Sequence, residues 1–582
     1  MLIALLSCAV ATGASAQTTY VVRNVGVVDT RGDSRPTRQD VVIRGRNIVQ
    51  LTGAGAARIA GATVIDGSGK FLMPGLIDSH VHIKQEDPLF LFVVNGVTTV
   101  QNMAGQAFHL RMRQQTAEGA LLGPRIITAG PTTAQVGVRT QAEVEKLVLD
   151  QKAAGYNIIK QYGSTAGAMD RDVYRKLSEV ARAQGMRLVG HAPRNLPFQV
   201  VLDERQSSID HMEEIVYTHA PFGRVLKPYV DFQFGRASTA LRDSLLRVPV
   251  PGFAGLLRSE IEQLARAAKT SGLAVTPNLG FFRNIQWSVS DSIHALLRDP
   301  DLAYAAPGLR LNWSPMLNRY RNAWNDRDLM DRYFGEVVEL QSAITAAFHR
   351  AGVPLMTGTD SEGLGAQPGF GLHTELELFV RAGMTPADAL RYATIVPARV
   401  MQIADSVGTV EAGKIADLVM LDANPLADIR NTRRIAGVFK SGRWVSAGAA
   451  AALLDSLARS YAPVQTALAT FMQALEQEGA VAAIEVYRAN PQRATIAKPV
   501  ENVINSYGYR VLGEGRVKEA IEIFRLNTVE FPAEFNTWDS LAEAYMTNKQ
   551  NDLAIKYYRK VLELHPGDQN ATSQLKRLGV SP

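Results

Sequence analysis

The sequence predicts an α/β protein in which a (β/α)8 TIM barrel is flanked by a composite β-sandwich domain and followed by a C-terminal α-helical, tetratricopeptide-like region. Three observations predict this architecture. Short β-branched runs alternate with Ala- and Arg-rich helical stretches over residues 74–399, as in βα units around a parallel sheet. Strand-like segments precede and follow that region. Small and aromatic residues near the end recur every 34 residues, the period of tetratricopeptide helix pairs.

The composition is that of a folded soluble protein with more than one domain. The chain has 582 residues, of which 46% are hydrophobic and 20% charged, and a chain of this length exceeds one compact core. The net charge is only +6, and Lys and Arg are interspersed with Asp and Glu. Because there is no basic stripe, we expect no nucleic-acid partner.

Residues 1–16 are predicted to be a signal peptide, because an apolar run precedes Ala14-Ser15-Ala16, a small-x-small cleavage pattern. The predicted location is therefore periplasmic. Two alternatives are a lipid anchor at Cys8 and a buried N-terminal helix. Cys8 is the chain's one cysteine, so the mature protein needs no disulfide and has no thiol nucleophile. No later stretch is long and apolar enough to span a membrane.

The β-domain is predicted to combine residues 17–73 with residues 400–447. Its first part contains strand-like segments such as Thr19–Val27 and Asp40–Gln50, and its second part contains Ala416–Leu421 and Ala436–Val445. Strands that lie on both sides of a barrel in the sequence can pair in one domain, because the two ends of a domain usually lie close together.

Residues 74–399 are predicted to form the barrel. The eight expected strands lie near residues 76–83, 97–102, 125–129, 156–162, 187–191, 207–211, 273–278 and 354–360. After the seventh strand, residues 281–335 are too long for an ordinary loop. They hold three of the five tryptophans, Trp287, Trp313 and Trp324. This insertion is either a lid over the substrate or a helical excursion whose aromatic residues form their own core.

The end of the chain is predicted to be helical. Residues 448–480 are Ala-rich and form a connector, and residues 481–582 contain the repeats. The repeat pairs are Gly508 with Ala542, Ala520 with Ala554, Phe524 with Tyr558, and Pro532 with Pro566. Two repeats are few for independent stability, so we expect them to pack on the barrel or on a second subunit. They are candidates for self-association, or for a binding role with the barrel as scaffold.

The sharpest motif for chemistry is Asp78-Ser-His80-Val-His82 on the first predicted barrel strand. Side chains alternate across a strand, so the two imidazoles share a face and can chelate one metal ion. Alone, a His-x-His pair is often an ordinary surface feature. Its meaning depends on partners at the ends of other strands, where barrel active sites lie.

Strand four supplies Lys160, which shares a face with Ile158 and Tyr162 by alternation. If Ile158 faces inward, the lysine is buried, and an unpartnered buried ammonium is costly. A neutral lysine amine can react with carbon dioxide, and the resulting carbamate can bridge two metal ions. The alternative is a solvated or salt-bridged lysine at a strand end.

Three further residues complete the pattern. His191 ends strand five, His211 ends strand six and Asp360 ends strand eight. A lone histidine at such a place is more often a core residue, but two on successive strands beside His-x-His and a lysine indicate ligands. The aspartate can bind a metal and accept a proton from bound water.

This ordered set resembles that of the binuclear metal-dependent amidohydrolases, over about residues 20–446. It is similar to the branch of imidazolonepropionase-like amidohydrolases, metal-dependent dipeptidases and ochratoxin-type amidases. The resemblance implies that His80, His82 and Asp360 hold one divalent metal ion, His191 and His211 a second, and carboxylated Lys160 bridges them. Zinc is the metal most expected. It also implies that a bridging hydroxide attacks a substrate carbonyl and that Asp360 passes the proton to the leaving amine.

The implied substrates are small amides, such as N-acyl amino acids or dipeptides. Alternatives on the same centre are lactones, carbamates and phosphotriesters. Heterocycle deamination is a further alternative, but the similar mononuclear deaminases carry His-x-x-Glu after strand five, where this chain has Arg194. Glu213 and Glu214 follow His211, so an acidic proton shuttle near that histidine stays open.

Candidate substrate contacts follow the strand ends. Tyr162 either polarises a substrate carbonyl, as a catalytic residue, or packs above Lys160. Other residues on these loops could line the pocket or grip a carboxylate: Tyr217, His219, Arg139, Arg194 and Arg283. Each arginine is also consistent with a plain surface charge. His373 and Glu375, after strand eight, are either pocket residues or ordinary residues of a helix.

Overall fold

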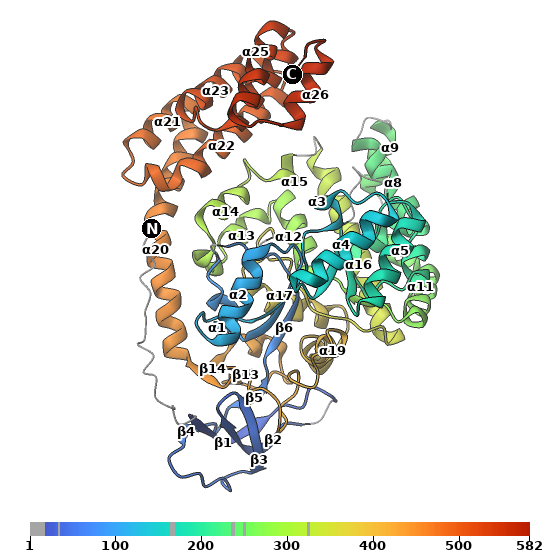
Figure 1. The fold of residues 1–582 in the computed structure, drawn as a ribbon, viewed down its shortest axis with the longest axis vertical. Coiled ribbons are helices and arrows are strands. Elements are labelled where there is room, and N and C mark those ends of the chain that lie inside the picture. Colours follow the sequence, from blue (N-terminus) through green and yellow to red (C-terminus); the bar gives the residue numbers. More distant parts are fainter. Residues whose placement is uncertain are drawn as a thin grey trace. The chain divides into compact units, whose positions relative to one another are not determined.

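The computed structural model describes residues 18–32, 35–85, 87–162, 169–233, 239–247, 252–322, 326–361 and 363–581 (Figure 1). The predicted signal peptide with Cys8, and Trp324 of the insertion, lie outside these residues. The chain divides into two compact units. The first comprises residues 1–227, 249–282 and 336–451, and the second comprises residues 228–248, 283–335 and 452–582.

One sheet of the first unit joins the two ends of the predicted barrel region. Among the described residues it has eight strands: β1 (Thr19–Val27), β2 (Thr37–Arg44), β3 (Asn47–Gly53), β4 (Thr63–Asp66), β5 (Phe71–Pro74), β13 (Leu418–Leu421), β14 (Ile435–Lys440) and β15 (Arg443–Ser446). The order is β15-β14-β13-β5-β1-β2-β3, and β4 pairs with β1. Strand β13 runs antiparallel to β5, with Leu418 opposite Pro74. The division into two facing layers that a sandwich requires stays a prediction.

Valine-rich alternation explains this sheet. Val22, Val25 and Val41 are fully buried and pack with Leu418 and Phe439 in one apolar cluster. Residues of the N-terminal and C-terminal strands therefore share a core, which ties the chain together where it enters and leaves the α/β region.

Seven parallel strands carry the predicted site. They are β6 (Leu76–Val81), β7 (Val97–Asn102), β8 (Arg125–Thr128), β9 (Ile158–Gln161), β10 (Arg187–Gly190), β11 (Ser208–Asp210) and β12 (Ala274–Thr276). They form a sheet in the order β6-β7-β8 and a second sheet in the order β12-β11-β10-β9. An isolated parallel bridge between Ala129 and Ile158 joins the two sheets. Each strand lies inside a predicted range and is equally long or shorter.

The eighth predicted strand, near residues 354–360, forms isolated bridges instead of a ladder. Leu355 bridges to Val275 of β12, and Ser361 bridges to Val81 of β6. Between them, Ser79 donates its backbone N–H to Thr357. Asp360 has a φ of 55°, which interrupts extended backbone. The segment thus contacts both sheets, while a closed barrel stays a prediction.

Helices alternate with these strands in the first unit: α1 (Phe90–Val94), α2 (Ala107–Glu118), α3 (Thr133–Val136), α4 (Gln141–Ala154), α5 (Arg171–Ala183), α6 (Phe198–Asp203), α7 (Met212–Thr218), α10 (Phe253–Leu256), α11 (Arg258–Ser271), α17 (Phe370–Arg381), α18 (Pro386–Tyr392), α19 (Ile395–Val400) and the short helix η2 (Ile429–Arg433). Local sequence sets their ends. Helix α4 starts at a capping box of Thr140 and Glu143 and ends at Gly155 with a φ of 89°.

Four helices include residues of both units: α8 (Ala220–Gln233), α12 (Leu279–Val289), α16 (Arg327–Ala351) and α20 (Ala447–Gln477). The other helices of the second unit are α9 (Thr239–Arg247), α13 (Ile293–Leu297), η1 (Pro300–Tyr304), α14 (Pro307–Asn312), α15 (Arg319–Asn322), α21 (Ala480–Ala489), α22 (Arg493–Gly513), α23 (Val517–Glu530), α24 (Phe535–Thr547), α25 (Asn551–Leu564) and α26 (Gln569–Arg577).

The C-terminal region is helical, as predicted, and each helix from α22 to α26 packs on the next along the chain (Figure 1). Three of the four residue pairs that recur every 34 residues are buried there, whereas Pro532 and Pro566 are exposed. Ala520, Phe524, Ala554 and Tyr558 are fully buried. A Cβ on Gly508 would come within 2.6 Å of the Phe524 ring, so only glycine fits there. Assignment of these helices as tetratricopeptide repeats stays a prediction.

The insertion packs with these C-terminal helices. Leu311 and Met316 belong to the same apolar cluster as the buried residues of α20 to α25. Its aromatic residues also contact one another, since Phe334 lies 6.5 Å from Tyr320 and 5.1 Å from Tyr333 between ring centroids. The insertion therefore shares the apolar core of the C-terminal helices, while a role as a lid stays a prediction.

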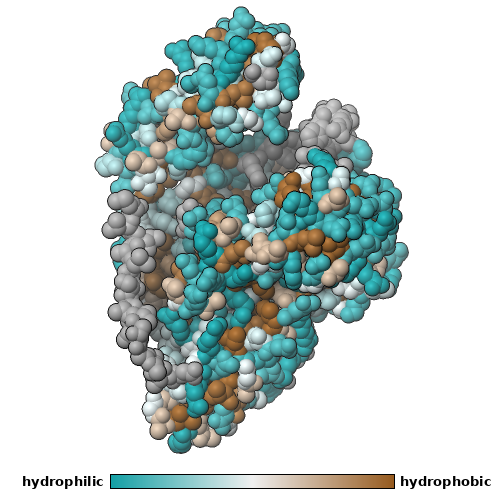
Figure 2. All heavy atoms as spheres, viewed as in Figure 1, coloured by the Kyte–Doolittle hydropathy of each residue, from teal (hydrophilic) through white to brown (hydrophobic). Residues whose placement is uncertain are grey.

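None of the helices found in the described ranges combines the length and the apolar character needed to cross a membrane. The face drawn in Figure 2 mixes hydrophobic residues among a hydrophilic majority.

Candidate metal centre

Three side chains from two neighbouring segments converge at the C-terminal end of β6. His80 belongs to β6, His82 follows it, and Asp360 lies on the segment that bridges to it. The two Nε2 atoms are 3.2 Å apart, and each is 3.2 Å from Oδ1 of Asp360. His80 is fully buried, whereas the side chain of His82 is 41% exposed.

This triangle fits a divalent cation. Ligand atoms about 2.0–2.1 Å from a tetrahedral zinc are separated by about 3.3 Å, so three atoms 3.2 Å apart form one face of such a site. Burial alone would raise the pKa of Asp360, but the neighbouring His80 and His82 bring that pKa well below its ordinary value. Asp360 is therefore a carboxylate, the form that binds a metal.

Two further imidazoles extend the cluster. His211 follows β11 and His191 follows β10, and their ring centroids lie 4.8 Å apart. The centroid of the His211 ring is 4.6 Å from that of His80. One potential ligand atom from each of His80, His211 and Asp360 lies within 4.8 Å of the other two. Burial brings the pKa of His191 and that of His211 well below the ordinary value. Both rings are therefore neutral, as metal ligation requires.

Lys160 lies beside this cluster and is buried, as predicted. The space it occupies depends on Gly190, which has a φ of 113° and whose Cβ would lie 2.5 Å from Cδ of the lysine. The lysine is not unpartnered, however, because Nζ donates to Oδ2 of Asp210 at 3.1 Å. The same carboxylate oxygen is 3.4 Å from Nδ1 of His80. The expectation of a neutral amine required a buried lysine without a partner, and Asp210 is a partner that the sequence did not reveal.

Backbone strain also gathers at these residues. His211 and Asp360 have φ values of 65° and 55°, and Asn278 at the end of β12 has 54°. For residues other than glycine this left-handed region is uncommon and costs free energy. Three such residues in one place indicate that the surrounding structure holds a functional arrangement against local preference.

Glu214 is a partner of the centre to which the sequence argument gave no such role. It is fully buried in α7, and its Oε1 accepts a hydrogen bond from Nδ1 of His191 at 2.8 Å. Arg194 also donates to this carboxylate, with Nη2 2.5 Å from Oε1. The prediction that Arg194 grips a substrate is therefore weakened, because its guanidinium is already paired. The sequence signal was the acidic pair, Glu213 and Glu214, in the first turn of α7.

Of the two candidate tyrosines, Tyr162 lies beside His191 and Tyr217 lies beside Arg194, while their roles as substrate contacts stay predictions. The Tyr162 ring meets the His191 ring edge-on at 4.7 Å, and 46% of the residue is exposed. Arg194 stacks over the Tyr217 ring at 5.3 Å, and Tyr217 is 39% exposed. His219 instead packs on Phe222, with ring centroids 4.7 Å apart.

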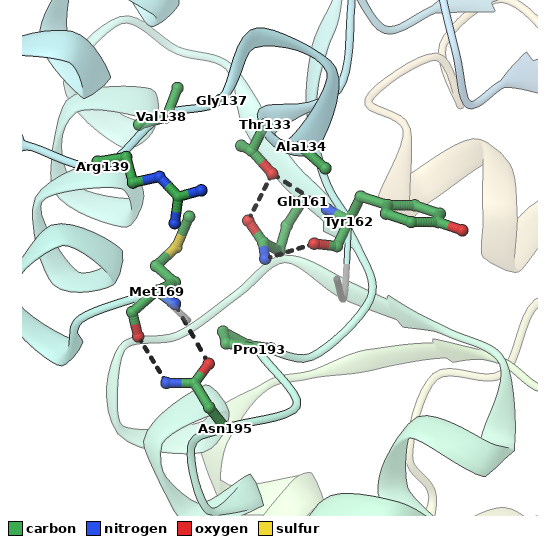
Figure 3. A pocket seen from close by; sticks show the side chains of 10 residues that line it. All are labelled: Thr133, Ala134, Gly137, Val138, Arg139, Gln161, Tyr162, Met169, Pro193 and Asn195. Carbon is green, nitrogen blue, oxygen red and sulfur yellow. Dashed lines mark hydrogen bonds between the residues drawn. The ribbon is translucent and has the colours of Figure 1, made fainter. Parts of the chain in front are cut away.

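Arg139 lies in a separate pocket of about 100 Å³, which Gln161, Tyr162, Pro193 and Asn195 also line. In Figure 3 the Tyr162 ring points away from the Arg139 guanidinium. The side chain of Gln161 occupies the space between them and accepts a hydrogen bond from Thr133. This pocket is therefore on the other side of the β9 end from the Tyr162 ring and His191.

The remaining candidates have structural partners. Arg283 belongs to the second unit and stacks on Trp287 at 4.4 Å, so it is not placed relative to the centre. His373 contacts Thr432 and the carbonyl of Asn95. Glu375 accepts the backbone N–H groups of Leu279 and Gly280 at the start of α12. For His373 and Glu375 the helical interpretation holds.

Asp78 is the first residue of the motif that contains His80 and His82. It is fully buried and accepts hydrogen bonds from the backbone N–H and the hydroxyl of Thr359, at 3.0 and 2.7 Å. Burial raises the pKa of Asp78 to about 7. The contact ties β6 to the segment that carries Asp360, and so keeps the two halves of the triangle in register.

Comparison with known proteins places this centre in a family. The model of the amidohydrolase family matches residues 92–445. A solved Xaa-Pro dipeptidase with bound methionine is 19% identical and has a TM-score of 0.51, covering 74% of this chain and 100% of its own. Bottromycin amidohydrolase is 21% identical with a TM-score of 0.57, covering 76% of this chain and 90% of its own.

Curated relatives match only short segments. A dihydroorotase of Trichlorobacter lovleyi is 51% identical over 45 residues, which is 8% of this chain and 10% of that protein. A dihydroorotase of Bacillus licheniformis is 35% identical over 66 residues, 11% of this chain and 14% of its own. The chain thus spans about a tenth of the length of these relatives. The family match covers more than half of the chain and contains His191, His211 and Asp360. The chain therefore belongs to the amidohydrolase family.

Proposed function

We propose that the protein is a binuclear metal hydrolase that cleaves the amide C–N bond of N-acyl amino acids or dipeptides. His80, His82 and Asp360 hold one metal ion and His191 and His211 hold the other. Lys160, once its amine had reacted with carbon dioxide, would supply a carbamate as a further ligand, and the donor set would suit zinc. The observation that carries this proposal is the triangle of Nε2, Nε2 and Oδ1 atoms at 3.2 Å beside two buried neutral imidazoles.

When bound, the metal ions supply a hydroxide nucleophile at neutral pH and polarise the scissile carbonyl. The chain's own groups then handle the proton. Asp360 is a carboxylate with 13% of its side chain exposed, so it can accept the proton of the nucleophile and pass it to the leaving amine. Tyr162 lies against His191 and is 46% exposed, which supports a role for its hydroxyl in polarising a substrate carbonyl.

The substrate class is supported by the names of proteins with a similar fold. A Xaa-Pro dipeptidase and Bottromycin amidohydrolase both act on C–N bonds by their names. At 19% and 21% identity the likeness concerns the fold, so the amide class is a proposal. Molinate hydrolase and phenylurea hydrolase B have a similar fold too. A panel of dipeptides, N-acyl amino acids, carbamates, lactones and phosphotriesters separates these alternatives, and ammonia release from aminated heterocycles would indicate deamination.

We also propose a closed barrel, in which the segment 354–361 completes the ring between β12 and β6. Backbone hydrogen bonds support this, since Met356 donates to Val275 and Asp360 donates to His80. Export to the periplasm after cleavage near Ala16, and self-association through residues 481–582, are further proposals. The small-x-small pattern and the packed helical region support them.

The test compares Lys160→Ala with Lys440→Ala in the mature protein. Lys440 is the matched control, because it is also a buried lysine paired with an aspartate, Asp417, but lies in the flanking sheet. We expect two metal ions per chain and amidase activity in the wild type, with metal uptake that depends on bicarbonate. Lys160→Ala should lose the second metal ion, the activity and the bicarbonate dependence, and Lys440→Ala should retain all three. One metal ion in the wild type, with a harmless Lys160→Ala, would refute the binuclear proposal.

A further inference from the structure

We propose that Asn278 is a further residue of the metal centre, and that Oδ1 and Nδ2 of its side-chain amide have separate roles. Oδ1 holds the backbone of His211, and Nδ2 donates a hydrogen bond to the oxyanion that forms when the substrate carbonyl becomes tetrahedral. The first role concerns the site itself, and the second rests on the proposed hydrolysis of an amide.

Asn278 is fixed by its neighbours on both sides. It lies two residues after the end of β12, beyond Pro277, and is fully buried, with a φ of 54°. The next two backbone N–H groups, of Leu279 and Gly280, donate to the buried carboxylate of Glu375 at 2.9 and 2.7 Å. A side chain on such a constrained corner has little freedom to reorient, which is what a preorganised donor requires.

The direction of the Asn278 amide follows from hydrogen bonding. The backbone N–H of His211 donates to Oδ1 at 3.2 Å. Because an N–H can only be met by an acceptor, the oxygen must face His211 and the NH2 group must face the opposite way. The same N–H also meets the carbonyl of Thr276 at 2.9 Å. His211 is thus held at its strained φ of 65° by two groups of the β12 end.

The NH2 group of Asn278 has no acceptor among the residues that the structure describes. A buried donor without a partner is costly, and native proteins keep few of them. Such a group is expected where a ligand supplies the partner.

Gly358 shows where the NH2 group lies. A Cβ at Gly358 would be 3.1 Å from Nδ2 of Asn278 and 3.0 Å from Cβ of His80. Nδ2 therefore borders the same small space as His80, two residues before Asp360 in the chain. His80 is one of the three residues whose ligand atoms form the candidate metal group, so the donor lies beside a candidate ligand.

The chemistry that fits this position is an oxyanion. The amide is a fully buried neutral donor, and preorganised donors of this kind stabilise negative charge that develops during the reaction. A neutral carbonyl oxygen in the ground state gains less from the same hydrogen bond, so the effect should appear in kcat more than in KM.

Two variants separate the two ends of the amide. Asn278→Ala removes the acceptor and the donor, whereas Asn278→Asp retains an acceptor for the His211 N–H and removes the donor. Asn527→Ala is the control for folding, because Asn527 is a fully buried asparagine in the C-terminal helices. The probes are inorganic phosphate and a phosphonate analogue of a dipeptide, whose tetrahedral anion mimics the proposed oxyanion. Their affinity for the zinc-loaded full chain is measured by calorimetry, and bound zinc by mass spectrometry.

We expect Asn278→Asp to keep the zinc content of the wild type and to bind the phosphonate at least ten-fold more weakly. The kcat of both Asn278 variants should fall about 10- to 1000-fold with little change in KM, and Asn527→Ala should match the wild type. If Asn278→Asp binds both anions as the wild type does, the donor role is refuted. If Asn278→Ala keeps the zinc content of the wild type, the acceptor role is refuted. A wild type that binds phosphonate but cleaves no amide would overturn the proposed function and leave the anion contact standing.

Discussion

Removing the carboxylate of Glu214 is expected to weaken metal binding through His191. Glu214 accepts the Nδ1 proton of His191 at 2.8 Å in a fully buried site. This hydrogen bond selects the tautomer whose Nε2 carries the free lone pair, and it makes that nitrogen a stronger ligand. The carboxylate also neutralises Arg194, so its loss leaves a cation beside a site that must bind a cation.

The structure sets the size of this effect. A hydrogen bond to a charged group contributes about 1.5–3 kcal/mol, which corresponds to roughly 10- to 150-fold in a binding constant. Glu214→Gln keeps a neutral acceptor of the same shape, so we expect about ten-fold weaker metal binding. Glu214→Ala leaves His191 and Arg194 without their partner, so we expect about 100-fold weaker metal binding.

Zinc titration of the metal-free full chain against a competing chelator measures this affinity. Glu213→Gln is the matched control on the next residue of α7. Burial, and the charge of Glu214, bring the pKa of Glu213 well above its ordinary value. Glutamine has the size of this side chain and leaves Glu214 and its hydrogen bond to His191 in place, so zinc affinity should change less than about two-fold. Wild-type affinity in Glu214→Ala, or an equal loss in Glu213→Gln, would refute the reasoning.

Three further outcomes are expected. Burial lowers the pKa of His373 to about 3 from an ordinary 6.5, so the folded protein stays neutral there while the unfolded chain takes up a proton below about pH 6.5. The free energy of unfolding should therefore decrease as the pH falls from 7 to 5. This decrease should be about 2 kcal/mol larger in the wild type than in His373→Gln. Urea titrations at both pH values check this, and parallel curves would contradict it. Gly358→Ala would place a Cβ 2.4 Å from Cγ2 of Thr276, so the neighbouring candidate ligands should be displaced. Zinc titration should show weaker binding, and an unchanged zinc affinity would contradict this crowding. Gly508→Ala should destabilise α22 and α23 by about 1–3 kcal/mol, as measured by hydrogen exchange. Gly513→Ala is the control, because the space around its Cβ is open, and it should not destabilise these helices. Equal protection from exchange in both variants would contradict the packing argument.

The candidate ligands could be predicted from the sequence because parallel strands bring their ends together. His80, His191, His211 and Asp360 each end a β-rich run, and the fold places them in one cluster. Their neighbours Asp210 and Glu214 could not be assigned, because a carboxylate beside a histidine in the sequence points to a partner only when the backbone geometry is known. The eighth strand was expected to be regular, and the left-handed φ of Asp360 made it a pair of bridges.

The sequence by itself determined the secondary-structure type, the parallel strands and the set of candidate ligands, because these depend on local periodicity and on residue chemistry. The tertiary structure decided which charges are partnered. Lys160 meets Asp210, Arg194 meets Glu214, and the Nδ2 donor of Asn278 meets no acceptor in the described part of the chain. It also packed the insertion with the C-terminal helices. These outcomes depend on distances between residues far apart in the chain, and no local pattern of residues encodes those distances.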